Sequence, residues 1–101
     1  MRRVLIVSTS YVEPTTRGKL RALAARGLDL TVAIPQRWRD PIGRLRESTW
    51  ERQQALEVFP IPMSHPGDLE NARFGRRELA ALVRDKRPEL LQVEEEPETA
   101  L

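Results

Sequence analysis

Aliphatic residues follow one another without a polar break near the start of the chain, and this segment organises the rest. Val4 to Val7 are four consecutive aliphatics inside the segment Arg3 to Thr9. A strand that is apolar on both faces is typical of the middle of a parallel sheet, where helices cover both sides. We therefore expect a central parallel strand at residues 3–9 and an α/β fold.

The apolar spacing then changes to that of a helix. A threonine at position 15 or 16 can cap this helix, which we expect to run to about residue 26. Its buried stripe is predicted to be Leu20, Leu23, Ala24 and Gly27, the glycine also ending the helix. The β-branched segment 28–34 predicts a second strand that ends at Pro35, so that the pieces form a right-handed βαβ unit.

The middle of the chain is harder to assign. Residues 35–53 contain prolines, a glycine and alternating charges without a clear period, so we expect a long loop with one helical turn at most. Residues 55–61 predict a short third strand. The Pro66-Gly67 pair places a loop at residues 63–71.

The last third of the chain predicts another helix and strand. The helix should begin at about Asp68 or Asn71 and end before Arg87-Pro88, and a fourth strand should follow at residues 89–93. Another helix would open at Pro97. The predicted buried stripe of the long helix is Phe74, Leu79, Leu82 and Val83.

These elements predict a Rossmann-like doubly wound sheet, in which the strands lie in the order 3-2-1-4. The chain stops soon after Pro97, with half of such a sheet still missing. We therefore expect residues 1–101 to be part of an N-terminal domain of a longer protein, or a product that needs a partner.

Composition excludes several classes of site. The chain has no cysteine and one histidine, which excludes disulfides and thiolate metal sites and leaves no ordinary zinc site. No apolar run approaches the roughly 20 residues that span a bilayer. We expect a soluble cytoplasmic protein without a metal or cofactor of its own.

The charge of the chain is nearly balanced, at +2, but its cations are unevenly placed. Five arginines and two tryptophans lie between Arg37 and Arg52. Acidic residues interrupt the cluster and no recognition motif accompanies it, so we do not expect nucleic-acid binding. A solvated loop is the preferred interpretation, and peripheral contact with an anionic membrane surface remains an alternative.

The strongest candidate site lies beyond the carboxyl ends of the first and fourth strands. In open α/β sheets ligands bind at this edge, and the 3-2-1-4 order would bring Glu13 to Arg17 close to Glu94 to Glu96. Glutamates can accept hydrogen bonds from the hydroxyls of a sugar, and we expect this of Glu95 and Glu96. We expect Glu94 to be a solvated strand end, whereas Arg17 could meet a phosphate or carboxylate at the start of the helix.

The order of these motifs resembles the start of the group 1 (family 4) glycosyltransferases. The segments that carry the resemblance are Val-Leu-Ile-Val-Ser at 4–8, Val-Glu-Pro-Thr-Thr-Arg at 12–17, the segment 20–39, and Lys-Arg-Pro-Glu-Leu-Leu-Gln-Val-Glu-Glu-Glu-Pro at 86–97. The resemblance implies a GT-B architecture of two Rossmann-like domains. This chain would be part of the N-terminal, acceptor-side domain, with the C-terminal donor domain absent.

The resemblance also implies retaining, metal-independent transfer from a nucleotide-sugar donor to a hydroxyl of a glycan, lipid or small-molecule acceptor. The first loop has Pro14-Thr15-Thr16 where many members have a glycine pair, and the donor-binding groups belong to the other domain. We therefore expect no catalytic residue in this chain, and no activity from it alone. The acceptor side of the cleft would be formed by Tyr11, Glu13, Thr15, Thr16, Arg17, Glu95 and Glu96.

Two further expectations concern assembly. The alternative to a glycosyltransferase is a stand-alone flavodoxin-like binding or regulatory module, which the hydroxyl-rich first loop weakly allows. If residues 89–93 form an unpaired edge strand, the isolated chain should self-associate or exchange strands through it.

Overall fold

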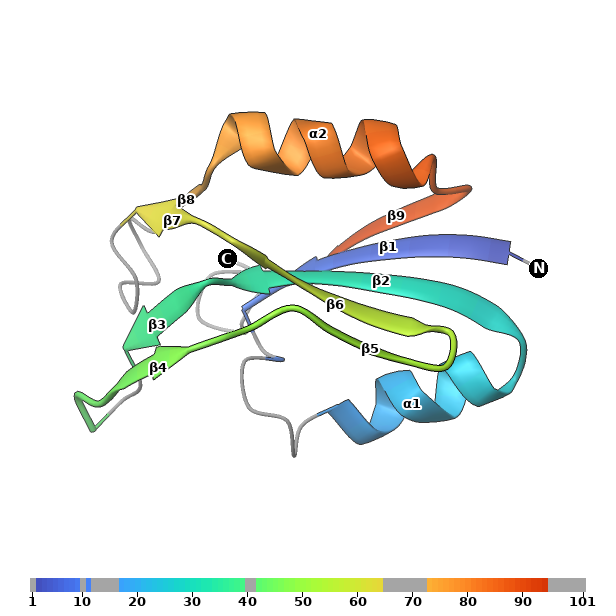
Figure 1. Ribbon diagram of the computed structural model, residues 1–101, viewed down its shortest axis with the longest axis horizontal. Helices are drawn as coiled ribbons and strands as arrows, with labels where there is room; N and C mark the ends of the chain where they lie inside the picture. Colours follow the sequence, from blue (N-terminus) through green and yellow to red (C-terminus); the bar gives the residue numbers. More distant parts are fainter. Residues whose placement is uncertain (1, 10, 12–16, 40–41, 65–72, 95–101) are drawn as a thin grey trace.

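The chain folds as an α/β structure in which two helices lie on opposite sides of a five-stranded sheet (Figure 1). This computed structural model describes residues 2–9, 11, 17–39, 42–64 and 73–94. Helix α1 spans Gly18–Ala25, and α2 spans Arg76–Lys86. In spatial order the sheet contains β5 (Glu51–Gln53), β6 (Leu56–Ile61), β2 (Leu28–Pro35), β1 (Arg2–Ser8) and β9 (Leu90–Glu94).

The strand order confirms the sequence prediction. Strands β6, β2, β1 and β9 are mutually parallel and correspond to the predicted third, second, first and fourth strands. The sheet is mixed, because β5 pairs antiparallel with the outer edge of β6. A Rossmann-like arrangement of the parallel strands is therefore observed.

Strand β1 is covered on both faces, as its aliphatic run predicts. Val4 and Ile6 pack in one core cluster with Leu20 of α1. The intervening side chains of Leu5 and Val7 pack in a second cluster with Leu82 of α2. The alternation of side chains along one strand thus distributes its apolar residues between two helix layers.

Helix α1 packs as predicted except at its end. Leu20 is buried, and Leu23 and Ala24 pack against the same core. Gly27 is wrong as a member of the buried stripe, since it is exposed and lies beyond the helix in the left-handed conformation, with φ of 99°. Glycine adopts this backbone conformation without the steric cost of a Cβ atom, so the residue ends the helix rather than packing it.

The prediction of a long loop at residues 35–53 is wrong. Strands β3 (Arg37–Arg39) and β4 (Leu45–Glu47) pair as an antiparallel hairpin, and β5 follows them. Each of these strands has only three residues, which is too short for a hydrophobic period to be recognised. Their pairing depends on backbone hydrogen bonds that the side-chain pattern does not reveal.

The long helix begins later than predicted. Phe74 is not part of α2 but lies in β8 (Arg73–Phe74), which pairs with β7 (Met63–Ser64), so the predicted loop at 63–71 also begins with a strand. The Gly75 amide donates to the Pro62 carbonyl at 2.8 Å, which fixes the entry to α2. The predicted stripe of Leu79, Leu82 and Val83 is confirmed.

Strand β9 forms the edge of the described sheet and is poorly covered. Leu90, Leu91 and Val93 are 50%, 49% and 61% exposed. These side chains alternate along the strand, so both faces of this edge are apolar. A solvent-exposed apolar edge is a favourable place for a further strand to pair.

Candidate functional site

The carboxyl ends of β1 and β9 meet at one edge of the sheet. The two strands are parallel neighbours, with Ser8 opposite Glu94. The carboxyl ends of the two strands therefore lie side by side, as the predicted site requires. Of the residues predicted to line it, the structure describes Tyr11 and Arg17; Glu13, Thr15, Thr16, Glu95 and Glu96 lie outside the described residues, as does the predicted helix start at Pro97.

A polar group of Tyr11, Lys19 and Glu94 occupies this edge. The Tyr11 side chain packs against the core on the α1 side and is only 6% exposed. The Lys19 ammonium lies 5.7 Å from the centre of the Tyr11 ring and 3.4 Å from the Glu94 carboxylate. Three distant parts of the chain thus contribute to one cluster: the segment after β1, the start of α1 and the end of β9.

Glu94 is not the solvated strand end expected from the sequence. Its side chain is 20% exposed and forms the ion pair with Lys19. The Gln92 amide also donates to its carboxylate, at 3.1 Å. The contribution of Lys19 was missed because its contact with Glu94 spans 75 residues of sequence. Its position in the first turn of the helix predicted to follow Thr15 or Thr16, beside the site, is the signal that could have identified it.

The cluster changes the ionisation of two groups. Burial raises the pKa of the Tyr11 hydroxyl; Lys19 opposes this effect and Glu94 reinforces it. Hydrogen bonding with Tyr11, together with the charge of Glu94, raises the pKa of Lys19. At neutral pH Tyr11 is therefore a neutral phenol and Lys19 an ammonium, and both can donate hydrogen bonds.

Arg17 connects Tyr11 to the edge of the sheet. Its side chain is 5% exposed; its Nε donates to the Tyr11 carbonyl at 2.8 Å and its Nη1 donates to Glu51 at 3.3 Å. The sequence predicted that this arginine could meet a phosphate or carboxylate of a ligand at the start of the helix, which stays a prediction; the contact that the structure shows is with Glu51 of β5. The guanidinium thus connects the segment after β1 to an edge strand of the sheet.

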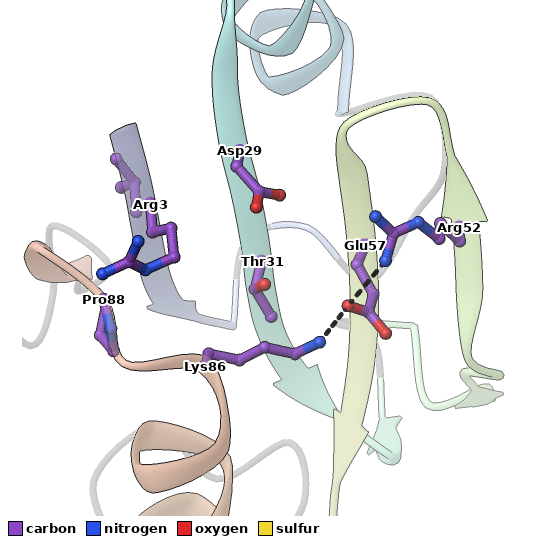
Figure 2. A pocket seen from close by; sticks show the side chains of 8 residues that line it. Arg3, Asp29, Thr31, Arg52, Glu57, Lys86 and Pro88 are labelled. Atoms are coloured by element: carbon purple, nitrogen blue, oxygen red, sulfur yellow. Dashed lines mark hydrogen bonds and ion pairs between the residues drawn. The ribbon is translucent and has the colours of Figure 1, made fainter. Parts of the chain in front are cut away.

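A second polar cluster surrounds Glu57 near the opposite, amino-terminal ends of the strands (Figure 2). Glu57 is 7% exposed and accepts hydrogen bonds from Trp50 Nε1 at 2.6 Å and from Lys86 Nζ at 2.5 Å. Arg52 lies 3.5 Å from the same carboxylate. The adjoining cavity, of about 50 Å³, is lined by Arg3, Val4, Asp29, Thr31, Arg52, Glu57, Lys86 and Pro88.

The Glu57 cluster connects three elements rather than forming part of the carboxyl-edge site. Burial raises the pKa of Glu57, but the hydrogen bonds from Lys86 and Trp50 and the nearby cations outweigh this effect and lower it below its usual range. The cluster joins β6 to β5 and to the end of α2. Sequence reasoning missed it, although the polar residues that alternate with aliphatics at Asp29, Thr31 and Glu57 were the available signal.

The described part of the chain shows neither a metal-binding cluster nor a membrane-spanning helix. No group of three or more histidine, aspartate or glutamate residues there could hold a metal ion. Neither α1 nor α2 is long and apolar enough to cross a membrane.

Comparisons with known proteins return no match for this chain. No family model matches it, and neither does any curated protein or solved structure.

Proposed function

We propose that this chain is the acceptor-side part of the N-terminal domain of a retaining GT-B glycosyltransferase. The observation that carries the proposal is the parallel pairing of β1 with β9, which places Tyr11 and Glu94 at one carboxyl edge. This edge is where ligands bind in open α/β sheets. The sequence resemblance supplies the reaction: metal-independent transfer of a sugar from a nucleotide-sugar donor to an acceptor hydroxyl, in the cytoplasm.

The described residues suit the binding of an acceptor. Glu94 retains lone pairs that can accept hydrogen bonds from hydroxyl groups, and the exposed ammonium of Lys19 can donate to an acceptor oxygen. The buried ring of Tyr11 fixes the position of both charged groups. Glu13, Thr15, Thr16, Glu95 and Glu96 would extend this surface along the adjoining segments. These groups bind and orient the acceptor and do not catalyse transfer.

The stand-alone flavodoxin-like module has less support. A flavodoxin-like sheet has the strand order 2-1-3-4-5, whereas the parallel strands here follow the order 3-2-1-4. Both orders are doubly wound, but the observed one is that of the Rossmann sheet, because the third parallel strand, β6, pairs with β2 and not with β1.

The isolated chain should bind acceptor sugars without transferring a sugar to them. The donor diphosphate must be stabilised as it leaves, and the resemblance places the groups that do this in the C-terminal domain. We expect no turnover of sugar nucleotides above the buffer blank. Titration with methyl glycosides should shift the backbone NMR signals of Tyr11, Lys19 and Glu94, whereas signals around Glu57 provide the internal control. Turnover by this chain, or shifts confined to the Glu57 cluster, would refute the proposal.

The intact mass of the gene product in its own cell tests the domain assignment separately. A mass several times the 11.6 kDa of this chain would support a two-domain enzyme. A mass equal to that of this chain would contradict the glycosyltransferase assignment and favour a small binding module.

The apolar edge of β9 leads us to expect that the 101-residue chain self-associates. Leu91 and Val93 lie on the same face of an uncovered edge strand, and another strand can pair with it. Val93→Lys should shift the sedimentation coefficient toward that of the monomer, because a charge on an edge strand opposes strand pairing. Arg84→Lys, an exposed and charge-neutral change on α2, is the control. A wild-type chain that remains monomeric over a hundredfold range of concentration would contradict this expectation.

A further inference from the structure

The β3–β4 hairpin lies outside the main sheet. It forms a separate two-stranded ribbon that extends beyond the carboxyl end of β2 (Figure 1). Arg37 pairs with Glu47, Trp38 with Arg46 and Arg39 with Leu45. Gly43, with φ of 85°, lies in the connection between the strands, of which residues 40–41 are not described.

The two faces of the hairpin differ in exposure. Directly opposed residues of an antiparallel pair point to the same face. Trp38 and Arg46 are half-buried, whereas the neighbouring pairs Arg39–Leu45 and Arg37–Glu47 are exposed. Ile42, near the end of the hairpin, is 74% exposed and Leu45 is 45% exposed. Large aliphatic side chains are therefore presented outward at the part of the hairpin farthest from its attachment to β2.

The hairpin is also rich in arginine: Arg39 lies directly opposite Leu45 on the exposed face, and Arg46 lies opposite Trp38 on the half-buried face. Arg37, Arg39, Arg44 and Arg46 carry four positive charges, against the two negative charges of Asp40 and Glu47 in the same segment. The Arg39 guanidinium donates to the Gly43 carbonyl at 2.8 Å, which places it next to the turn. Arg37 and Glu47 form an ion pair at 3.8 Å in which both side chains are about two-thirds exposed. The hairpin thus combines an exposed apolar end with a net positive charge.

We propose that the β3–β4 hairpin binds the surface of an anionic lipid bilayer. Ile42 and Leu45 enter the boundary between headgroups and acyl chains, and the arginines contact lipid phosphates. Exposed apolar residues bordered by polar ones mark interaction sites, and cationic side chains beside them favour anionic lipid. Arginine can also keep its guanidinium at the headgroups while its alkyl stem remains in apolar surroundings. This proposal is independent of the glycosyltransferase assignment.

The same residues fit a nucleic acid less well. Nucleic-acid surfaces that lack a recognition motif usually offer exposed aromatic rings on which bases stack. Here the outward residues are aliphatic, and Trp38 belongs to the half-buried face of the hairpin. A bilayer can accommodate aliphatic side chains, which a polynucleotide backbone cannot.

Vesicle sedimentation tests the proposal directly. The intact chain is mixed with vesicles of phosphatidylcholine alone, or with about 30% phosphatidylglycerol, at low and physiological salt. We expect binding to the anionic vesicles, weakened by salt. The Arg39→Gln/Arg44→Gln double variant should bind them about tenfold more weakly or worse. The Ile42→Ser/Leu45→Ser double variant should lose a similar fraction of binding while the net charge remains unchanged.

A matched variant distinguishes binding through the hairpin from a general attraction of basic residues to anionic vesicles. Arg76→Gln/Arg77→Gln removes two exposed charges at the start of α2 and should leave vesicle binding within twofold of wild type. Equal weakening by this control, or no wild-type binding to anionic vesicles, would overturn the proposal. Hairpin-dependent binding to single-stranded DNA without vesicle binding would assign the face to nucleic acid instead. Circular dichroism checks that each variant is folded.

Discussion

Replacement of Glu57 by alanine should lower the free energy of unfolding by about 3 kcal/mol. The carboxylate is nearly inaccessible to water and is held by Trp50, Lys86 and Arg52. Its removal leaves the Trp50 and Lys86 donors without their partner and disconnects β6 from both β5 and α2. Arg52 and Trp50 are both about half-exposed and can regain water, so most of the loss comes from the contact with Lys86, which is 25% exposed. Urea unfolding at pH 7, followed by circular dichroism, measures the difference.

The stability contributed by the Glu57 charge should depend on pH. Its pKa in the folded chain lies below the ordinary value, so the folded state binds this proton less tightly than the unfolded state. The contribution is therefore present above the unfolded pKa and is lost as the pH falls through the folded pKa. Between pH 7 and pH 3 the wild-type chain should lose more stability than Glu57→Gln, which has no carboxylate to protonate.

Glu89→Gln is the control for the effect of burial. Its ion pair with Arg3, at 3.8 Å, is exposed on both sides, so the change should cost less than about 1 kcal/mol. If Glu57→Ala proved no more destabilising than Glu89→Gln, the Glu57 cluster would not stabilise the fold. An unchanged pH dependence in Glu57→Gln would contradict the lowered pKa.

The parallel core could be predicted because its side-chain pattern is long and consistent. Val4 to Val7 require cover on both faces, and the helices on either side provide it. The strand order could then be predicted as 3-2-1-4, because this is the order of a Rossmann-like sheet built from right-handed βαβ units. These features depend on local sequence and general packing rules, and four strands were placed correctly without knowledge of any contact.

The short strands and the start of α2 could not be predicted in this way. Phe74 has the spacing of the helix stripe, yet its backbone pairs with Met63 in a two-residue bridge. Three-residue strands such as β3 and β5 are defined by their partners and not by a period of their own. Where an element depends on a distant partner, the local side-chain pattern carries little information about it.

Only part of the candidate site could be predicted, because its other contacts also join residues that are distant in the sequence. The meeting of β1 and β9 followed from topology, and Tyr11 and Arg17 were named from the first loop. The ion pair between Lys19 and Glu94 could not be predicted, because it depends on where α1 lies relative to β9. No spacing in the sequence gives that position. The partner of Arg17 is Glu51, 34 residues away in a strand that the sequence did not reveal.

Arg17→Ala should destabilise the fold by about 2–4 kcal/mol and release the Tyr11 backbone from its contact with the guanidinium. The guanidinium is buried and satisfies the Tyr11 carbonyl, which would lose its donor. The half-exposed Glu51 can return to water, so the cost arises mainly at Tyr11 and in the space left by the side chain. Arg17→Lys keeps the charge but lacks the fork that reaches two acceptors, and it should fall between alanine and wild type.

Arg26→Ala is the matched control for this substitution. Arg26 adjoins the other end of α1 and is exposed, so its removal should change the free energy of unfolding by less than about 0.5 kcal/mol. In Arg17→Ala the NMR signals of Tyr11 and Glu94 should broaden or shift, while those around Glu57 should not. A loss as small as that of Arg26→Ala would show that the guanidinium does not hold the Tyr11 backbone. Destabilisation with an unchanged Tyr11 signal would show that Arg17 stabilises the sheet through Glu51 without positioning the candidate site.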